Sequence, residues 1–354
     1  MKTILFILPD LNQGGAERVI TTLCNELDRT RFCPKLVLFK KEGYYLNHLK
    51  NDVEIIELNI ERIRYSIFKI VPLIKRLKPE IVFTGWGEIS AFLSPIVPLF
   101  PKTKFITRET NVVSEHVKRK EILFFYRFYN NFDQIIAQSD DMKNDLVKHF
   151  KISENKIVKI NNPVDFDLIN RLKEHDIDVD YNKSYKNIVA IGNLSPRKGF
   201  DLLLNVMNHL KDQKIKLTIL GDGAFKEELI QQKENFHLDN VTFLGKVANP
   251  FVYLKNADLF ILSSRYEGFP NVLLEAGSCG TYSLANNAPG GINEIIQDKI
   301  NGEIFPIEDS EGFANKIKEI LPQNHSKEEI IESIFSRFSK EIIIKKYESI
   351  FDQI

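Results

Sequence analysis

The sequence has few of the residues that mark several whole classes of protein. It contains only three cysteines in 354 residues, Cys24, Cys33 and Cys279. Their odd number and their lack of metal-ligand spacing exclude a disulfide framework and a cysteine zinc site, and indicate a reduced, cytoplasmic compartment. Lysine plus arginine equals aspartate plus glutamate, 48 of each, so the formal net charge is zero. Charge gives no support for a nucleic-acid partner, and we expect none.

Long apolar runs are also missing. The stretch from residue 89 to 100 is apolar but short, and it is broken by Pro95 and Pro98, whereas a spanning helix needs ~20 apolar residues. The first eight residues resemble the apolar part of a signal peptide, yet Pro9-Asp10 closes them and no small-residue cleavage site follows. We therefore expect a buried first strand and no membrane-spanning segment.

What the sequence does contain is a regular alternation of short apolar runs and amphipathic segments. Short, nearly continuous apolar runs are typical of strands buried on both faces of a parallel sheet, and the segments between them fit helices. The alternation predicts an α/β fold with doubly wound parallel sheets, whose ligands bind beyond the carboxyl ends of the strands. The predicted strands are residues 3–8, 35–39, 53–58, 81–84, 104–107, 134–138, 157–160, 187–191, 217–220, 241–244 and 257–262.

A charged segment poor in large aliphatic residues divides the chain into two such units. It reads RLKEHDIDVDYNKSY from residue 171, a composition typical of a linker between domains. We predict an N-terminal domain over residues 1–169, a linker over 170–186, a C-terminal domain over 187–335 and a final helix over 336–354.

The stretch from residue 263 to 294 carries the clearest sign of chemistry. Glu267 and Glu275 are separated by seven residues, the first in the loop after a predicted strand and the second in the following helix. Ionised carboxylates only accept hydrogen bonds, so the pair suits the hydroxyl groups of a sugar and a ribose. Gly290 and Gly291 then open another helix, whose first N–H groups and dipole favour an anion. Either glutamate alone would more often be a cap or a solvated residue.

These residues form a compound motif, E-G-F-P-N-V-L-L-E followed by A-x-x-C-G and then a G-G-x-x-E turn. The motif resembles the donor-binding signature of the retaining family 4 glycosyltransferases, and the resemblance extends over nearly the whole chain. It implies the GT-B fold, with two Rossmann-like domains facing a central cleft and the last helix packing back on the N-terminal domain. It also implies that Glu275 binds the ribose, that Glu267 binds a hydroxyl of the transferred sugar and that Glu294 lies near the donor.

Two adjacent cations, Arg197 and Lys198, follow the first predicted strand of the C-terminal domain. Arginine offers a planar fork and lysine a point charge to phosphate oxygens, so the pair suits a diphosphate, although such pairs are often only solvated surface. The family usually has an arginine where this chain has Asn193, and we hypothesise that Arg197 compensates. The turn at Gly14 and Gly15 matches the family's G-G-A-E turn and is a further donor-binding candidate.

The segment from Arg108 to Asn111 ends another predicted strand, in a region where many family members have a histidine that contacts the donor sugar. The nearby His116 falls in a basic helix, so we assign no catalytic histidine and treat Arg108, Glu109 and Asn111 as acceptor-side candidates. The pair at residues 140–141 is acidic but follows a serine at a predicted helix start, where acidic residues stabilise the helix dipole. The family needs no metal, and we expect neither a metal nor another cofactor.

The resemblance implies a hexosyltransferase that moves a hexose or N-acetylhexosamine from a nucleotide sugar, most simply a UDP-sugar, with retention. Arg197, Lys198 and the N–H groups near the glycine pair would stabilise the leaving diphosphate. The expected acceptor is a polyprenyl-diphosphate-linked glycan in surface polysaccharide synthesis, such as lipopolysaccharide or capsule. Basic and aromatic segments at residues 62–78 and 118–129 predict peripheral association with the anionic inner face of the cytoplasmic membrane, although core helices with solvated lysines have a similar pattern.

Two other functions remain open at this level. A nucleotide-sugar epimerase of the same fold would need no acceptor, and the basic helices argue against it. A degenerate transferase would bind a sugar nucleotide or a glycan without turnover. Asn193, the missing histidine and Tyr282, where relatives have proline, favour that alternative. The presence of Glu267, Glu275 and Lys198 weighs more in favour of an active transferase.

Overall fold

The computed structural model describes residues 1–12, 14–175, 181 and 184–354. The contacts within the chain divide it into two compact units. Unit 1 consists of Met1–Pro163 together with Lys340–Ile354, and unit 2 is Val164–Ser339. Each unit has its own parallel sheet and its own hydrophobic core.

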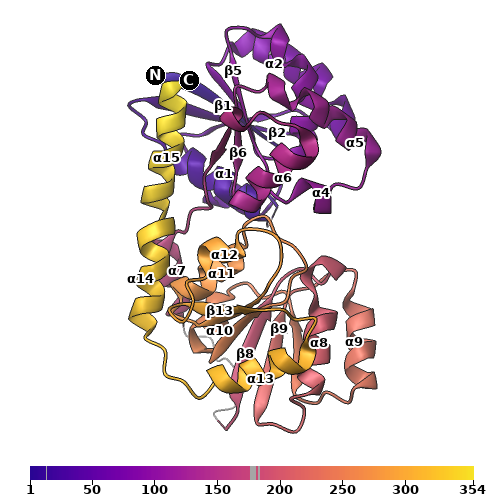
Figure 1. The fold of residues 1–354 in the computed structure, drawn as a ribbon. Helices are drawn as coiled ribbons and strands as arrows, with labels where there is room; N and C mark the ends of the chain where they lie inside the picture. The colour runs from indigo at the N-terminus through magenta and orange to yellow at the C-terminus, as the bar shows by residue number, and fades with distance from the viewer. Residues whose placement is uncertain (13, 176–180, 182–183) are drawn as a thin grey trace. The chain divides into compact units, whose positions relative to one another are not determined.

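Unit 1 is built on a seven-stranded sheet with the order β3-β2-β1-β4-β5-β6-β7, in which every strand pair is parallel. Helices lie on both faces of this sheet (Figure 1). The strands are β1 (Lys2–Leu8), β2 (Phe32–Leu38), β3 (Glu54–Glu57), β4 (Ile81–Thr84), β5 (Lys104–Arg108), β6 (Gln134–Ala137) and β7 (Ile157–Lys159). The α-helices are α1 (Gly15–Glu26), α2 (Ile67–Leu77), α3 (Gly87–Leu93), α4 (Val113–His116), α5 (Lys120–Phe125), α6 (Asp140–Phe150) and α15 (Lys340–Gln353).

The central strand β1 shows why this sheet is covered on both sides. Its side chains alternate between the two faces, as in any strand. Leu5 and Ile7 belong to the core cluster on one face, whereas Ile4, Phe6 and Leu8 belong to the cluster on the other. All five are fully buried. The nearly continuous apolar run of the sequence is therefore the direct consequence of a strand with two buried faces.

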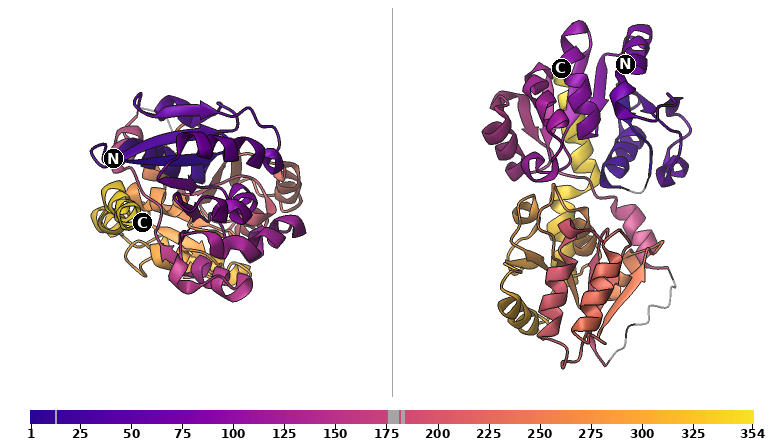
Figure 2. Two further views of the ribbon diagram at one scale, coloured as in Figure 1. Left: turned by 90° about the horizontal axis from the view of Figure 1, so that it is seen from above. Right: turned by 90° about the vertical axis from the view of Figure 1, so that its right-hand side faces the viewer.

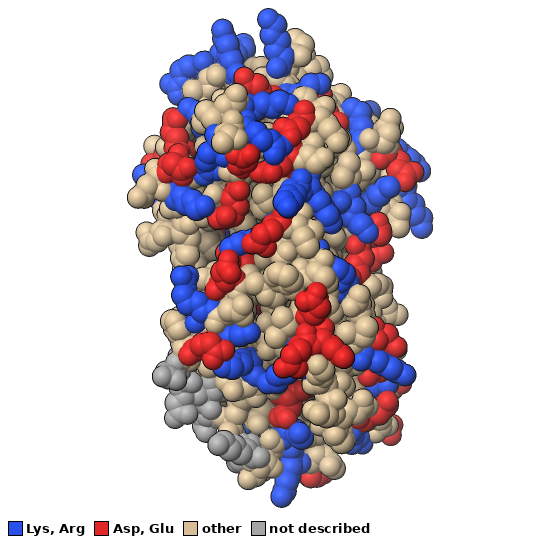
Figure 3. All heavy atoms as spheres, turned by 90° about the vertical axis from the view of Figure 1, so that its left-hand side faces the viewer, with Lys and Arg blue, Asp and Glu red and all other residues tan. Residues whose placement is uncertain are grey.

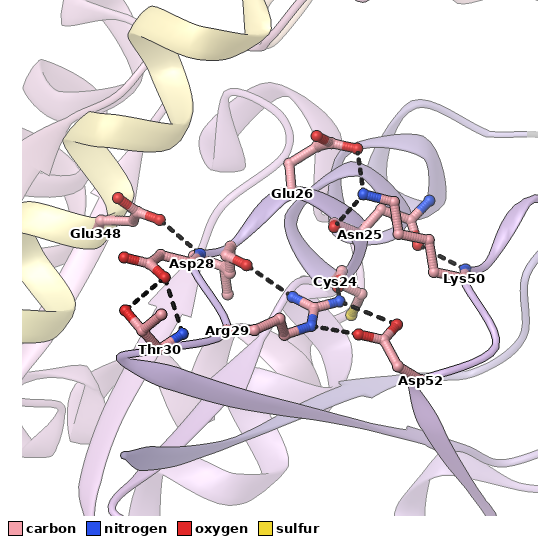
Figure 4. Close-up of polar contacts among 10 residues, drawn as sticks. Cys24, Asn25, Glu26, Asp28, Arg29, Thr30, Lys50, Asp52 and Glu348 are labelled. Atoms are coloured by element: carbon pink, nitrogen blue, oxygen red, sulfur yellow. Dashed lines mark hydrogen bonds and ion pairs between the residues drawn. The ribbon is translucent and has the colours of Figure 1, made fainter.

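The last helix, α15, belongs to unit 1 and closes one of its cores. Phe351 contacts the rings of Phe6 and Phe32 edge-on, with centroids 6.4 and 5.9 Å apart. Glu348 accepts a hydrogen bond from the backbone N–H of Asp28 at 2.8 Å, in the loop after α1 (Figure 4). In the further views the yellow C-terminal helix likewise runs beside the indigo start of the chain (Figure 2). The final helix was predicted over residues 336–354; α15 begins at Lys340, and Ser339 separates it from the preceding helix.

Unit 2 has a six-stranded parallel sheet with the order β10-β9-β8-β11-β12-β13. Helices again lie on both faces (Figure 1). The strands are β8 (Lys186–Ile191), β9 (Ile215–Leu220), β10 (Val241–Gly245), β11 (Leu259–Leu262), β12 (Ser283–Asn286) and β13 (Gly302–Phe305). The α-helices are α7 (Phe166–Lys173), α8 (Phe200–Asn208), α9 (Lys226–Asn235), α10 (Phe251–Asn256), α11 (Asn271–Ser278), α12 (Ile292–Ile295), α13 (Ser310–Ile320) and α14 (Lys327–Phe338).

The predicted fold class, α/β with two doubly wound parallel sheets, is confirmed. All eleven predicted strands are present, with ends that differ by at most three residues. Two strands, β12 and β13, were not predicted. The reason is visible in β12, whose polar residues Ser283 and Asn286 are buried. Asn286 donates to the Ser264 carbonyl and accepts from the Ile307 N–H, so tertiary hydrogen bonds satisfy groups that a sequence pattern assigns to a loop.

The predicted domain boundaries stay predictions. The first four residues of the predicted linker, 170–173, belong to α7. Most of the rest of that segment, residues 176–180 and 182–183, lies outside the described part of the chain.

Within the described ranges, no helix combines the length and the apolar character that crossing a membrane requires. On the face drawn in Figure 3, positive and negative side chains are interspersed, as the zero net charge of the sequence suggests.

Candidate functional site

Three loops of unit 2 come together because they leave neighbouring strands at the same edge of the sheet. Strands β8, β11 and β12 are adjacent and parallel, so their carboxyl ends lie side by side, where ligands of such sheets bind. The loop after β8 holds Arg197 and Lys198, the loop after β11 holds Glu267, and the loop after β12 holds Gly290 and Gly291.

A tight turn presents the two cations. Pro196–Lys198 form a single 3₁₀ turn that ends at Gly199, whose φ of +64° is left-handed. A Cβ on Gly199 would lie 2.1 Å from the Ser263 carbonyl oxygen, so glycine allows the loops after β8 and β11 to touch. As a result, the Lys198 side chain is buried and the Arg197 side chain is partly exposed.

Glu267 is the centre of the site. One carboxylate oxygen accepts from the Lys198 ammonium at 2.5 Å and from the Ser264 hydroxyl at 2.7 Å. The other oxygen accepts from the Arg197 guanidinium at 2.9 Å. The three charges sum to +1, so the cluster keeps a net attraction for an anion while its buried carboxylate is fully paired.

The pKa of Glu267 reports this balance. Burial raises the pKa of the carboxyl, but Lys198 and Arg197 outweigh burial and hold the pKa below its ordinary value, with help from the Ser264 hydrogen bond. Glu267 is therefore a carboxylate at neutral pH, with two cations already placed on it. The sequence prediction that these three residues act together is compatible with this geometry, while their roles stay predictions.

The glycine turn after β12 packs directly against the loop that carries Glu267, which the sequence does not indicate. A Cβ on Gly290 would lie 2.4 Å from the Glu267 carbonyl oxygen, and one on Gly291 would lie 2.1 Å from the Phe269 ring. The Gly291 N–H, expected to face an anion, instead donates to the Gly268 carbonyl at 2.9 Å. The helix that follows, α12, has only four residues, so its dipole is small. The turn holds the Glu267 loop in place, the Gly291 N–H is not directed at an anion, and a role of Gly290 and Gly291 in donor binding stays a prediction.

The other residues of unit 2 that are candidates for donor binding are Glu275, Glu294 and Asn193. Glu275 is in the second turn of α11 and is 8% exposed. Glu294 is half-buried on α12, where its backbone carbonyl accepts from Arg337 at 2.7 Å. Asn193 is exposed and faces Gly223 in the loop after β9. Arg197 is the residue that supplies a guanidinium to the cluster.

In unit 1, Gly14 is the N-cap residue of α1, and Gly15 is the first residue of the helix. A Cβ on Gly14 would lie 2.1 Å from a carboxylate oxygen of Glu17. Glu17 is buried, and burial raises its pKa to about 7. The charge of Asp10 also raises this pKa, whereas the backbone N–H of Glu17 and the charge of Arg108 lower it. Glu17 was not among the predicted site residues, because one carboxylate in a helix gives no sequence signal.

Arg108 and Glu109, two of the acceptor-side candidates, are buried, with 1% and 3% exposure. The Arg108 guanidinium donates to Asn162, and Glu109 accepts from the hydroxyls of Tyr129 at 2.8 Å and Tyr126 at 3.3 Å. Burial raises the pKa of Glu109 to about 7, although both tyrosines lower it. Both side chains lie in the interior of unit 1. The third candidate, Asn111, is half-buried after β5.

The acidic pair at residues 140–141 lies in the first turn of α6, where the Ser139 hydroxyl accepts from the Met142 N–H. This is the helix start that the sequence predicted. In the described part of the chain, no three His, Cys, Asp or Glu side chains are grouped as a metal ion would require.

Comparison with known proteins defines the class to which this fold and site belong. The HepE protein of Anabaena, in a crystal structure with UDP-glucose, superposes with a TM-score of 0.83, at 18% identity over 100% of both chains. This likeness shows a shared fold, the GT-B fold of glycosyltransferases.

The sequence comparisons give the family. Residues 13–168 match Glycosyltransferase Family 4, and residues 173–337 match Glycosyl transferases group 1. An uncharacterized glycosyltransferase of Methanocaldococcus jannaschii, MJ1059, is 30% identical over 66% of this chain and 62% of its own length. The N-acetylgalactosamine-N,N'-diacetylbacillosaminyl-diphospho-undecaprenol 4-alpha-N-acetylgalactosaminyltransferase of Campylobacter jejuni is 25% identical over 91% of this chain and 90% of its own. This chain belongs to the family 4 glycosyltransferases of the GT-B fold.

Proposed function

We propose that this glycosyltransferase moves a hexose or N-acetylhexosamine from a UDP-sugar to a lipid-linked glycan during surface polysaccharide synthesis. The UDP-glucose in the structure of HepE supports the nucleotide. The diphospho-undecaprenol in the name of the Campylobacter enzyme supports the acceptor. The place of action in this proposal is the inner face of the cytoplasmic membrane.

The observation that carries the proposal is the cluster of Arg197 and Lys198 on the buried carboxylate of Glu267. A nucleoside diphosphate leaves with growing negative charge, and cations that are already oriented stabilise that charge without reorganising. Glu267 holds both cations at one place. When a donor binds, its phosphate oxygens take the outer faces of the cations, and Glu267 remains as an acceptor for a hydroxyl of the sugar.

The proposed reaction is metal-independent and retains the configuration of the anomeric carbon. The bond from the anomeric carbon to the β-phosphate oxygen breaks, and a bond from that carbon to the acceptor hydroxyl oxygen forms on the same face. The proton of the acceptor hydroxyl passes to the leaving phosphate oxygen. Glu275 binds the ribose, Glu294 and the Gly14-Gly15 turn lie near the donor, and Asn111 is the acceptor-side candidate that remains accessible.

Two basic and aromatic surfaces of unit 1 support a membrane-bound acceptor. Near the start of α2, Tyr65 and Phe68 are 51% and 76% exposed. Next to α5, the Arg127 guanidinium lies over the rings of Phe124 and Phe128, at 5.0 and 5.8 Å. Exposed aromatic rings beside cations are suited to the headgroup region of an anionic bilayer.

The test is nucleotide release from UDP-, GDP- and ADP-sugars, with and without a membrane lipid extract. The proposal expects release from one UDP-sugar that rises with the extract and falls by about 10²- to 10³-fold in Lys198→Ala, the effect typical of one transition-state donor. Arg197→Ala should also lose turnover, and full activity in that variant would refute its compensating role for Asn193.

Two results would contradict the proposal. UDP binding without release from any donor would favour a degenerate binding protein. Conversion of a UDP-sugar into its epimer without any acceptor would favour the isomerase.

A further inference from the structure

Three consecutive backbone carbonyls of the cation turn are bound by one short segment after β11. The Pro196 carbonyl accepts from the Arg265 guanidinium at 2.6 Å. The Arg197 carbonyl accepts from the Arg265 backbone N–H at 2.8 Å. The Lys198 carbonyl accepts from the Ser263 hydroxyl at 2.8 Å. The turn that carries both cations is therefore fixed residue by residue.

The Arg265 side chain also ties this turn to the helix that follows it. Its two terminal nitrogens donate to the two carboxylate oxygens of Asp201, at 2.8 and 2.6 Å. Asp201 lies in the first turn of α8. One guanidinium thus joins the start of the turn, at Pro196, to the helix just beyond its end, in the bidentate geometry that only arginine provides.

The same segment supplies the carboxylate on which the cations rest. Arg265 precedes Glu267 by two residues, and Ser264, immediately before Arg265, donates to Glu267. We call the contacts of Arg265 with the turn and with Asp201 the clamp. The clamp and Glu267 belong to the same short segment, so a shift of the turn relative to this segment would separate Arg197 and Lys198 from Glu267.

We propose that Arg265 is a positioning residue, which holds the turn of Arg197 and Lys198 in the geometry that stabilises the leaving diphosphate. The role of these cations rests on the proposed function. The competing interpretation is that Arg265 and Asp201, with side-chain exposures of 38% and 25%, form an ordinary surface ion pair, which contributes little.

Unit 1 offers a matched control in Arg29 (Figure 4). Its guanidinium donates to the carbonyls of Cys24 and Leu27 and to the carboxylate of Asp52, and its side chain is 31% exposed. The contacts are of the same kind as those of Arg265. Arg29 precedes the amino end of β2, at the sheet edge opposite to the carboxyl ends of the strands.

The first measurement needs no ligand. Hydrogen exchange followed by mass spectrometry on peptides spanning residues 195–200 reports the Lys198 and Gly199 N–H groups, which donate within the turn to Ser195 and Pro196. In Arg265→Ala their exchange should accelerate by about tenfold, as local order is lost. In Arg29→Ala it should not change. Unchanged exchange in Arg265→Ala would overturn the proposal.

The second measurement connects the clamp to the cations through a double-mutant cycle on UDP affinity, measured by calorimetry. Arg265→Ala should weaken UDP binding by about tenfold in the wild-type background and by less than twofold in Lys198→Ala, because the clamp acts through that lysine. Arg265→Lys should recover only part of the loss. Equal losses in the two backgrounds would refute a positioning role.

Turnover separates this proposal from the proposed function. If the wild type binds UDP but releases nucleotide from no donor, the proposed transferase activity fails, and the cycle and the exchange data still decide the role of Arg265. If the wild type is active, kcat should fall by about tenfold or more in Arg265→Ala and stay within twofold in Arg29→Ala. Unchanged kcat in an Arg265→Ala protein with a loosened turn would overturn the proposal.

Discussion

The two units share a strand topology, but the pKa values of their buried carboxyls Glu267 and Glu109 are shifted in opposite directions. Glu267 follows β11 in unit 2 and accepts from two cations, which hold its pKa below the ordinary value against the effect of burial. Glu109 follows β5 in unit 1 and accepts from two tyrosine hydroxyls. Burial therefore dominates there and raises the pKa of Glu109 to about 7.

The neighbours of a buried carboxylate determine whether it is charged. A neighbouring cation keeps a buried carboxylate ionised, but the cation must then be desolvated as well. Hydroxyl donors alone do not offset burial, so the pKa of the carboxyl stays raised. Glu267 and its cations form a charged cluster beside loops that can approach a ligand. Glu109 is a packing group whose charge depends on pH. Substitutions at these two carboxylates and at their neighbours are expected to differ in effect between the two units.

The largest effect is expected for Glu267→Gln. The neutral amide leaves Lys198 buried beside Arg197 without a counter-charge, and removal of one partner from a buried ion pair typically costs about 3–5 kcal/mol. The free energy of unfolding from urea titration should fall by that amount, and nucleotide release should be lost. Glu227→Gln, at an exposed glutamate of the same unit, is the control. A stability equal to that of the control would show that the cluster is not a paired unit.

Glu109→Gln should change the free energy of unfolding by less than Glu267→Gln does. The change should depend on pH, and it should be an increase instead of a decrease. Between the ordinary value of 4.5 and about 7, the folded protein binds more protons at this carboxyl than the unfolded chain does. The contribution of Glu109 to the stability of the wild type is therefore largest at low pH and falls by about 3 kcal/mol as pH rises to about 7. The variant should lack this fall.

The single tryptophan, Trp86, lies in unit 1, so its fluorescence during urea unfolding measures the relevant unit. Parallel stability curves of wild type and Glu109→Gln from pH 5 to pH 8 would contradict the prediction. Glu115→Gln, at an exposed position in the same unit, serves as the control.

Glycine substitutions should have the next largest effect on stability, and this effect should differ between the two units. A Cβ on Gly290 meets the Glu267 backbone, and the φ of +126° at Gly290 is disfavoured for any L side chain. We expect Gly290→Ala to cost about 1–3 kcal/mol of stability. Gly14→Ala meets only the end of the Glu17 side chain, which can rotate, so it should cost less. Thermal unfolding of both variants tests the order, and a larger loss in Gly14→Ala would reverse our interpretation.

The smallest effect is expected for Arg29→Ala. It removes an ion pair with Asp52 and the guanidinium contacts to the last carbonyls of α1. Partly exposed contacts of this kind contribute about 1 kcal/mol. Urea unfolding should show this loss with unchanged turnover. A stability loss of several kcal/mol would mean that the contact is more strongly coupled to the core than its exposure indicates.

The sequence by itself determined the architecture and the centre of the site. Apolar runs such as Ile4 to Leu8 predict strands because burial on both faces requires apolar residues at every position. The order of strands and helices places Arg197, Lys198 and Glu267 in loops that leave neighbouring strands, which suffices to predict that they lie at one sheet edge.

The tertiary structure alone decided which partners each polar group has. The Gly291 N–H binds Gly268, Glu109 binds two tyrosines, and Asp201 binds Arg265, 64 residues away. Periodicity reports only whether a position is buried. Hydrogen bonds and charge pairs join residues that are distant in the chain, and their geometry, which sets both pKa values and positioning, exists only once the sheet is formed.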